Sequence, residues 1–536
     1  MPSSATVKQQ LREKDQQKLF ISILIEIGLL ALSSLLFALS FPNFISSWGW
    51  FPLGFIALVP VFIVVHRAGW VRVFLYGILY GFASYALFNF WLLTFHPLAL
   101  IIVPTIYAFY FLLLFPLLKL ADRLFPSYGY LVQLALWLAF EYLRTRGFLG
   151  YSYGVMGYSQ YLFLPLARVA SLAGIWGVTL LVVFPSVYLG NALKNGTRGI
   201  AQFYRRHSIE LLLFGALFIG AIIYGMAAKV DYSESPSWRT ACIQHNVDPW
   251  KHDYEDSLDI LVRLSNEAME ENPEIVIWSE TAFVPAIDYH TRYRQNHEAY
   301  NLVKRLLDYL ARQPVPYVIG NDDGQLKRIG GIERIDYNAA LLFEDGKLSD
   351  RYRKVHLVPF TENFPFEEQL PGVYNWLKNA DTHFWEKGDE FTVFEAAGVR
   401  FSTPICFEDT FGYLSREFVL EGAEVIVNLT NDSWSFSVAA MMQHMGMSVF
   451  RAVENKRSVV RSTNGGITCT IDPNGKIIDR LAPFVEGYMI SEVPVYTRGN
   501  TLYTLFGDWF GLLSVGTAVA LLSFGIIRRL LRRKWN

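Results

Sequence analysis

The chain has 536 residues, of which 52% are hydrophobic and 18% are charged, and its net charge is −1. This length allows more than one domain, and a nearly neutral chain without a basic patch argues against a nucleic-acid partner. Long apolar runs dominate the sequence before about residue 228 and after about residue 507, whereas the stretch between them has the mixed composition of a globular domain. The sequence therefore divides into two unlike parts.

Eight segments have the character of membrane-spanning helices. Crossing the hydrocarbon core takes roughly 20 mostly apolar helical residues. The segments that approach this length are residues 19–40, 50–65, 71–95, 99–120, 128–145, 168–193, 209–228 and 508–527. The fifth is the weakest, because Glu141, Arg144 and Arg146 lie near its end, so a partial or re-entrant helix is the alternative there. The sequence assigns no role to Glu26, Glu141 or Arg144.

The basic residues of the loops predict the orientation of these spans. Lys and Arg gather on the cytoplasmic side of membrane proteins. They occur in both tails and in every second loop, whereas the loops around Phe41–Gly49 and His96–Pro97 carry none. Both termini are therefore expected in the cytoplasm and residues 237–495 outside it. The loop with Arg144 and Arg146 is an exception to the pattern.

Between about residues 237 and 495, apolar strands alternate with amphipathic helices. The turn signal Asp472–Gly475 separates two further β-like runs, residues 466–471 and 476–479. Alternation of this kind predicts a layered α/β domain. The predicted strands are residues 274–278, 317–320, 338–343, 401–405 and 424–428, and the predicted helices are residues 254–271, 293–312 and 411–420.

Three reactive residue types follow one another at or just after predicted strand ends: Glu280, Lys354 and Cys406. The nucleophile of a cysteine enzyme is a thiolate, so it needs a base beside it or a lowered pKa. Glu280 can take the thiol proton, and the positive end of the helix after Cys406 is expected to lower the thiol pKa. Lys354 and the N–H of Phe407 are candidate donors to an oxyanion. Together these residues indicate acyl-transfer chemistry on Cys406.

Each of these residues also has an ordinary structural interpretation. An acid or a lysine near a strand is usually solvated, and a cysteine that ends a strand is more often part of the core. Cys242 and Cys469 lie in short β-like runs and are expected to be buried structural cysteines. The chain contains no Cys-x-x-Cys or His-x-x-x-His spacing, so no metal site is predicted.

The motifs around the three reactive residues resemble those of the nitrilase superfamily, whose catalytic residues are a Glu, a Lys and a Cys. They are Trp278–Glu280, Tyr352–Leu357 and Ile405–Glu408. The apolar spans point to a membrane-embedded member of this superfamily. Further motifs resemble those of bacterial apolipoprotein N-acyltransferases over nearly the whole chain. These motifs are Phe37–Pro42, Gly157–Gln160, His356–Phe360, Asn431–Trp434, Gln443-His444 and Arg461–Asn464.

The resemblance implies a polytopic α-helical membrane domain of about eight helices, in residues 1–228 and 508–527. It also implies an extracytoplasmic, nitrilase-like αββα sandwich in residues 237–495. In that family a fatty acyl chain passes from a membrane phospholipid to the cysteine as a thioester. It then passes to the α-amino group of the N-terminal diacylglyceryl-cysteine of an apolipoprotein, in a ping-pong reaction at the bacterial inner membrane. The protein is expected to act as a monomer, without a cofactor or a metal ion.

The resemblance also implies roles for individual residues. Cys406 is expected to be the nucleophile, Glu280 the general base and Lys354 the oxyanion partner. Glu362 and Glu408 are expected to order the site. Two positions and two short segments depart from the usual pattern of the family, although none includes a reacting residue. They leave the acyl-chain and headgroup preference open. The departures are Ser279 for Pro, Phe407 for Tyr, Thr361-Glu-Asn for Gly-Glu-Tyr and Ser435-Phe for Phe-Gly.

A lipid-derived acyl chain needs an apolar route to Cys406. Phe364, Phe366 and Trp434 lie in apolar segments that Pro or Asn interrupts, and Trp250 matches an entrance tryptophan of the family. These four residues are candidates for a substrate entrance. The alternative is that the aromatic rings pack under their own loops.

Two other functions remain open from the sequence. A membrane-tethered amidase that uses water as acceptor would carry the same three residues, but it would need only one anchor. A transporter or receptor with a degenerate nitrilase-like domain would show paired charges deep in several helices. Glu26 and Glu141 instead lie near the ends of their segments.

Overall fold

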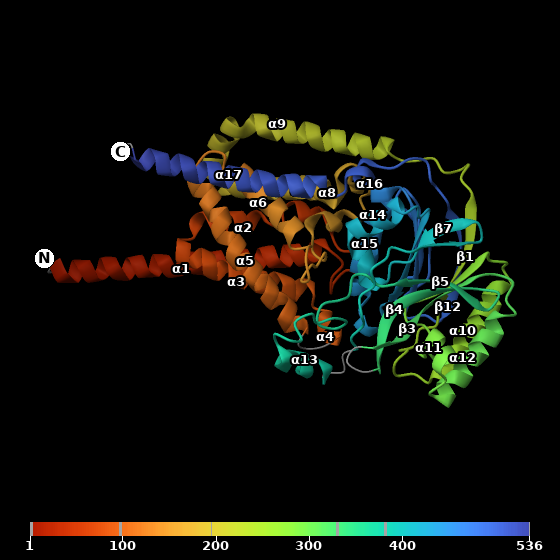
Figure 1. Ribbon diagram of the computed structural model, residues 1–536. Helices are drawn as coiled ribbons and strands as arrows, with labels where there is room; N and C mark the ends of the chain where they lie inside the picture. The colour runs from red at the N-terminus through yellow and green to blue at the C-terminus, as the bar shows by residue number, and fades with distance from the viewer. Residues whose placement is uncertain (1–3, 96–98, 195, 329–331, 380–382, 535–536) are drawn as a thin grey trace.

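The structure, a computed structural model, describes residues 4–534 apart from 96–98, 195, 329–331 and 380–382. A bundle of long helices carries a layered α/β domain at one end, and both ends of the chain lie at the opposite end of the bundle (Figure 1). The predicted loop around His96–Pro97 lies outside the described residues in part. The two unlike parts of the sequence thus form the two parts of the structure, the helical bundle and the α/β domain.

Six helices of the described chain are long and apolar enough to cross a membrane. The predicted spans at residues 50–65 and 128–145 form shorter helices than expected. A helix of about 15 residues extends only about 22 Å, which is less than the thickness of the hydrocarbon core. The first is the short turn η1 (Phe51–Phe55) followed by α2 (Val59–Arg67), and the second is α6 (Gly129–Leu143). The six long helices are α1 (Ser4–Ser40), α3 (Trp70–Phe88), α5 (Ala99–Leu124), α8 (Ala170–Leu193), α9 (Thr197–Ala227) and α17 (Trp509–Lys534).

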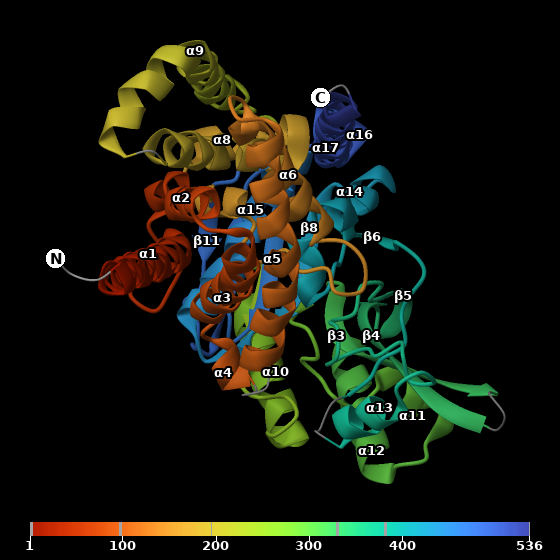
Figure 2. The same ribbon diagram turned by 90° about the vertical axis from the view of Figure 1, so that its left-hand side faces the viewer.

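The outside of this bundle is apolar. In Figure 2 the helices α3 and α5 lie side by side in the middle of the bundle, and α9 lies at its edge. Leu113 of α5, Leu212 of α9 and Val519 of α17 are 66%, 70% and 60% exposed. A soluble monomer rarely exposes a continuous surface of this kind, whereas hydrocarbon accommodates it. The bundle has the surface of a membrane domain.

Several charged side chains inside the bundle are paired. Glu26 accepts hydrogen bonds from Arg72 at 2.5 Å and from Tyr76 at 2.8 Å, which ties α1 to α3. Glu141 forms an ion pair of 3.1 Å with Arg144 at the end of α6. Burying an unpaired charge in hydrocarbon is costly, so pairing explains how these residues are accommodated.

The α/β domain contains two six-stranded sheets. Their strand orders are β12-β1-β2-β3-β4-β5 and β11-β10-β9-β8-β7-β6. The strands are β1 (Ser237–Gln244), β2 (Ile275–Trp278), β3 (Tyr317–Arg328), β4 (Ile332–Glu344), β5 (Lys347–Arg353), β6 (Val393–Ala396), β7 (Val399–Ser402), β8 (Val425–Asn431), β9 (Ser458–Asn464), β10 (Cys469–Ile471), β11 (Ile477–Arg480) and β12 (Gly487–Pro494).

The two sheets pack face to face and helices cover their outer faces. Trp238 of β1 meets Phe401 of β7 with 5.1 Å between ring centroids, and Ser462 of β9 donates a hydrogen bond to the carbonyl of Ile277 in β2. The helices α10 (Tyr254–Met269) and α12 (His297–Leu310) bury leucines against the first sheet. On the second sheet lie α14 (Gly412–Leu420) and α15 (Val438–Asn455). This layering is the αββα sandwich that the sequence resemblance implied.

Local sequence signals explain most of these boundaries. The Asp253 side chain caps α10 by accepting hydrogen bonds from the N–H groups of Glu255 and Asp256. The predicted helix over residues 293–312 is wrong in one respect. Arg294 adopts a left-handed conformation that ends α11 (Ile287–Tyr293), and Asn296 caps the new helix α12. The turn predicted at 472–475 is confirmed and joins β10 to β11.

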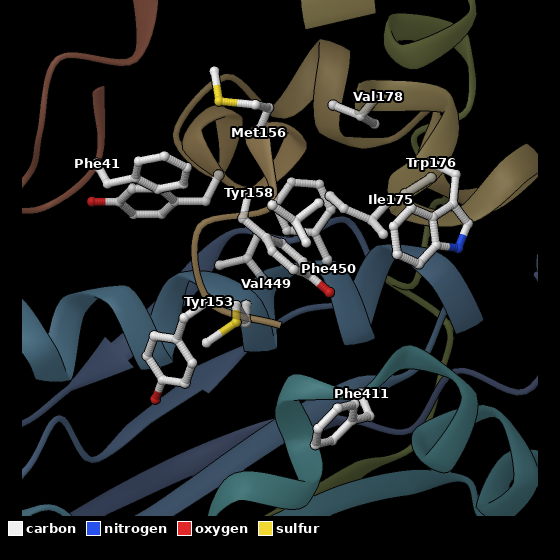
Figure 3. Packing of buried hydrophobic residues seen from close by; sticks show 14 of the residues in the cluster. Phe41, Tyr153, Met156, Tyr158, Ile175, Trp176, Val178, Phe411, Val449 and Phe450 are labelled. Carbon is white, nitrogen blue, oxygen red and sulfur yellow. The ribbon is translucent and has the colours of Figure 1, made fainter. Parts of the chain in front are cut away.

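The helix α15 joins the two parts of the molecule. Its residues 439–455 are all buried, because the helix lies between the second sheet and the bundle. Tyr158 of the turn η2 (Met156–Gln160) packs on Phe450 of α15 (Figure 3). Their ring centroids are 5.2 Å apart. Gln443 donates hydrogen bonds to the carbonyls of Pro42 and Phe88. The α/β domain is thus packed directly on the membrane domain.

Candidate active site

The structure brings Glu280, Lys354 and Cys406 together at one end of the two sheets. Glu280 lies two residues beyond β2, Lys354 follows β5, and Cys406 opens the short turn η3 (Cys406–Thr410). The Nζ atom of Lys354 is 3.5 Å from Oε1 of Glu280. Both charged groups act on the Cys406 thiol, whose pKa Glu280 raises and Lys354 lowers. Three residues that are far apart in the sequence therefore form one electrostatic unit.

Glu280 is held by a hydrogen bond to each carboxylate oxygen. Oε1 accepts from the side-chain amide of Asn338 at 2.8 Å, and Oε2 accepts from the N–H of Asn431 at 2.9 Å. The residue is only 5% exposed. Burial raises the pKa of Glu280, although Lys354 opposes this shift. A carboxylate with a raised pKa and a fixed orientation is suited to accepting and returning a proton.

Lys354 is fully buried and has a second carboxylate partner. Its Nζ donates to Oε1 of Glu362 at 2.8 Å, while Oε2 of Glu362 accepts from the N–H of Val358 at 2.9 Å. Burial alone lowers the pKa of Lys354, but Glu362 and Glu280 outweigh it and the net shift is upward. Lys354 thus stays an ammonium, as an oxyanion partner must.

Glu408 connects the backbone beside Lys354 with the backbone beside Cys406. Its carboxylate accepts from the N–H groups of Val355 at 2.8 Å and His356 at 2.9 Å, and from that of Ile405 at 2.7 Å. The hydroxyl of Tyr352 also donates to it at 2.9 Å. Burial raises the pKa of Glu408 to about 7. This one side chain fixes the spacing of the two segments that carry Lys354 and Cys406.

Cys406 differs from the other two cysteines. Cys242 and Cys469 are buried, as predicted, whereas Cys406 keeps part of its surface exposed. Its φ of 50° is a left-handed conformation that costs a non-glycine residue roughly 1–3 kcal/mol. Such strain is typical of functional positions.

The expected lowering of the Cys406 pKa by a helix dipole is wrong. Burial and Glu280 together raise the pKa of the thiol well above its usual value. The dipole effect is confined to the first turn of a helix, and α14 begins only at Gly412, after the short turn η3. The thiol is therefore protonated at rest and depends on a base to become a nucleophile.

The four candidate entrance residues do not form one group. Phe366 is 42% exposed and lies 5.6 Å, between ring centroids, from Phe148, which follows α6 of the bundle. Phe364 is buried at 7% exposure and contacts Phe366. Trp434 contacts Trp91, between α3 and α4 (Leu92–Phe95), at 5.7 Å. Trp250 belongs to a different group, with His383 and Trp385.

The sequence reasoning missed two features near the site. Asn338 fixes the orientation of Glu280, and the only signal for it is a polar residue at the start of a predicted apolar strand. The segment Gly150–Gly154 has the Gly-x-Ser-x-Gly spacing of serine hydrolases. However, it follows helix α6 in a loop, and Ser152 is buried. The strand-to-helix elbow that exposes a nucleophilic serine is therefore missing from this described segment.

Metal ligation finds no support among the described residues, where no three His, Cys, Asp or Glu side chains group closely enough to hold an ion. The candidate site instead combines a thiol, a carboxylate with a raised pKa and a buried ammonium. Such a set can form and resolve an acyl thioester without further groups.

Comparison with known families agrees with both parts of the chain. Residues 239–501 match the family described as carbon-nitrogen hydrolase. Residues 33–188 match the family described as apolipoprotein N-acyltransferase N-terminal domain. The first match coincides with the two-sheet domain, so the predicted nitrilase-like fold is confirmed.

Several curated proteins are similar over nearly the full length. Apolipoprotein N-acyltransferase 1 of Treponema denticola is 42% identical over an alignment that covers 96% of this chain and 98% of that protein. The apolipoprotein N-acyltransferase of Borreliella burgdorferi is 30% identical, with 90% of this chain and 92% of that protein covered.

Among solved structures, the Nit3 protein of Saccharomyces cerevisiae, described as a member of the nitrilase superfamily, has a TM-score of 0.36. It is 20% identical, and the match covers 48% of this chain and 90% of Nit3.

Proposed function

Because the chain belongs to the apolipoprotein N-acyltransferase family, we propose that it transfers a fatty acyl chain from a membrane phospholipid to an apolipoprotein. The acceptor is the α-amino group of the N-terminal diacylglyceryl-cysteine. The observation that carries this proposal is the similarity to the Treponema denticola enzyme over 96% of the chain, which includes the membrane domain. The chain is an acyltransferase of the nitrilase superfamily. Its expected donor is a lipid, and its expected acceptor is a lipidated protein.

In the first half-reaction, Glu280 takes the proton of the Cys406 thiol while the sulfur attacks the ester carbonyl carbon of the phospholipid. The carbonyl oxygen becomes an oxyanion, for which the ammonium of Lys354 and the N–H of Phe407 are the donors. The carbon–oxygen bond then breaks, and Glu280 returns its proton to the departing oxygen. A lysophospholipid leaves, and the acyl chain remains on Cys406 as a thioester.

In the second half-reaction, the neutral α-amino group of the lipidated cysteine attacks the thioester carbonyl. Glu280 accepts a proton from the nitrogen, the carbon–sulfur bond breaks, and the Cys406 sulfur recovers the proton. The product is an amide, and the free enzyme is restored. Because the first product leaves before the acceptor reacts, the kinetics are ping-pong.

The supporting residues act through these three. Glu362 is bonded to the Lys354 ammonium at 2.8 Å and so fixes its position. Glu408 fixes the backbone on both sides of the reacting groups through the N–H of His356 and the N–H of Ile405.

A membrane-tethered amidase is the alternative function, since water could resolve the same thioester. The products distinguish the two. Purified protein supplied with phospholipid and a diacylglyceryl peptide should yield an N-acylated peptide and a lysophospholipid in equal amounts. Release of free fatty acid at the same rate with and without the peptide would instead identify a hydrolase.

The charge pattern of the loops also supports an orientation, with residues 237–495 in the periplasm and both termini in the cytoplasm of a bacterial inner membrane. The test is cysteine labelling with an impermeant reagent in a Cys406→Ala background, because Cys242 and Cys469 are buried. A Lys304→Cys variant, at an exposed site of α12, should be labelled in cells with a permeabilised outer membrane. An Arg532→Cys variant should be labelled only after lysis, and the reverse pattern would overturn this orientation.

We also propose that Phe366 lines the donor entrance, because it is exposed and contacts Phe148 of the membrane domain. Phe366→Ser should raise the KM for phospholipid severalfold and leave the rate of thioester formation at saturation unchanged. Its melting temperature should stay close to that of the wild type, because exposed side chains contribute little to stability. Tyr293→Ser, at the end of α11, is the matched control and should change neither value. An unchanged KM with a lower melting temperature would show that Phe366 is a packing residue.

A further inference from the structure

The peptide group between Cys406 and Phe407 is held from its carbonyl side. The carbonyl oxygen of Cys406 lies 3.3 Å from Nδ2 of Asn428 and 3.3 Å from Nε2 of His444. A trans peptide is planar and directs its carbonyl and its N–H to opposite sides. Whatever fixes the Cys406 carbonyl therefore also fixes the direction of the Phe407 N–H, which is the backbone donor proposed for the oxyanion.

His444 of α15 is placed between two carboxylates. Its Nε2 atom is 2.8 Å from Oδ1 of Asp409, and its Nδ1 atom is 3.2 Å from Oδ1 of Asp432. The single Nε2–H is therefore shared between Asp409 and the Cys406 carbonyl, and the carbonyl receives the longer of the two bonds. Ionised carboxylate oxygens only accept hydrogen bonds, so both ring nitrogens must carry protons. The side chain is 3% exposed. The geometry thus requires a buried imidazolium beside the backbone carbonyl of Cys406.

The charges around this imidazolium balance. Asp409 also pairs with Arg461 of β9, whose Nη2 atom is 3.7 Å from Asp432. Two carboxylates thus face one guanidinium and one imidazolium, and a neutral His444 would leave a net negative charge buried beside Cys406. Burial lowers the pKa of His444, but Asp409 outweighs this and the value rises to about 9. From the bundle side, Tyr153 faces the ring at 6.2 Å between centroids.

We propose that His444 is a positioning residue whose imidazolium holds the Cys406 carbonyl and thereby directs and strengthens the Phe407 N–H as an oxyanion donor. A hydrogen bond from a cation to a carbonyl polarises the whole peptide group, which makes its N–H a better donor. The inference rests on the proposed function, because it concerns the oxyanion of thioester formation. It gives His444, Asp409 and Asp432 a part in the chemistry although none of them is proposed to touch the substrate.

Two substitutions separate the contact from the charge. His444→Asn places its amide near the former Nδ1 position, so it loses both the contact with the Cys406 carbonyl and the positive charge. His444→Gln places an amide nitrogen near the former Nε2 position, so it keeps a donor to that carbonyl without the charge. In a single-turnover assay of thioester formation, the rate of His444→Asn should fall on the order of 10–100-fold. This loss is no larger than the rate loss on removing an oxyanion donor outright, about 10²–10³-fold. His444→Gln should lie between it and the wild type.

Two readouts distinguish positioning from a merely structural role. The KM for phospholipid should be unchanged in both variants, because the contact acts on the transition state and not on donor binding. The rate of thioester formation in the wild type should also fall as pH rises through about 9, where His444 loses its proton. That fall should be missing in His444→Gln. His290→Asn, at another buried histidine on α11, should match the wild type throughout.

A wild-type rate of thioester formation in folded His444→Asn would overturn the inference, as would a loss that appears only in KM. If His444→Asn does not fold, the same two criteria apply to His444→Gln. Cys406→Ala is measured in parallel. Thioester formation by that variant would contradict the proposed function itself, whereas an inactive Cys406→Ala beside fully active His444 variants would contradict this inference alone.

Discussion

Replacing Cys406 with alanine is expected to abolish both thioester formation and transfer to the acceptor. Both half-reactions pass through the thioester on the Cys406 sulfur, so no partial activity should remain. The protein should still fold, because the change removes one sulfur atom and leaves the hydrogen bonds of Glu280 and the Lys354–Glu362 pair in place. The loss should therefore appear in activity and not in the melting temperature.

The matched control for this variant is Cys469→Ala. Cys469 is also a free cysteine, but it is buried in β10. Its replacement should leave transfer intact in the folded protein, at some cost in stability from the small cavity. Substantial transfer by purified Cys406→Ala, or a complete loss in folded Cys469→Ala, would contradict the assignment of the nucleophile.

Substitutions at Glu280 and Lys354 should give the next largest losses. Glu280→Gln cannot take the thiol proton, and the raised pKa of Cys406 means that few thiolates form without a base. The rate of thioester formation should fall about 10²–10⁴-fold. Lys354→Met removes the fixed positive charge and should slow the same step on the order of 10²–10³-fold. Burst kinetics with a chromogenic or mass-tagged donor measure both.

The two variants should differ in stability. Lys354→Met leaves the carboxylates of Glu280 and Glu362 buried without their common partner, and losing one partner of a buried pair costs about 3–5 kcal/mol. Glu280→Gln keeps the Lys354–Glu362 pair and should be more stable. Glu362→Gln is the comparison, because it removes a partner of Lys354 without removing a reacting group. A burst of wild-type size in Glu280→Gln or Lys354→Met would rule out the corresponding role.

The grouping of Glu280, Lys354 and Cys406 could be expected from the sequence because each residue lies near the end of a predicted strand. Strands that run in the same direction place such ends at one edge of a sheet. Cys406 follows β7 of the second sheet, however, so only the packing of the two sheets brings it to Glu280 and Lys354 of the first. The bonds that orient these residues could not be expected in the same way. Asn338 lies in β4 and His444 in a helix, and neither the period of a strand nor that of a helix tells which distant group a polar side chain will face.

The membrane spans show the same division. Apolar length marks the helices because hydrocarbon imposes it, yet the shortness of α6 and the pairing of Glu26 with Arg72 depend on how the helices pack. The predicted lowering of the Cys406 pKa fails for a related reason. The sequence indicates a following helix, whereas the burial that raises the pKa arises only in the folded molecule.

The most direct test of the proposed mechanism is mass spectrometry of the purified wild-type protein after incubation with a phospholipid of defined acyl chain and no acceptor. We expect one added acyl mass, localised by peptide mapping to Cys406 and released when a diacylglyceryl peptide is supplied. An acyl group on another residue, or N-acylation of the peptide with no acyl-enzyme at any time, would contradict it.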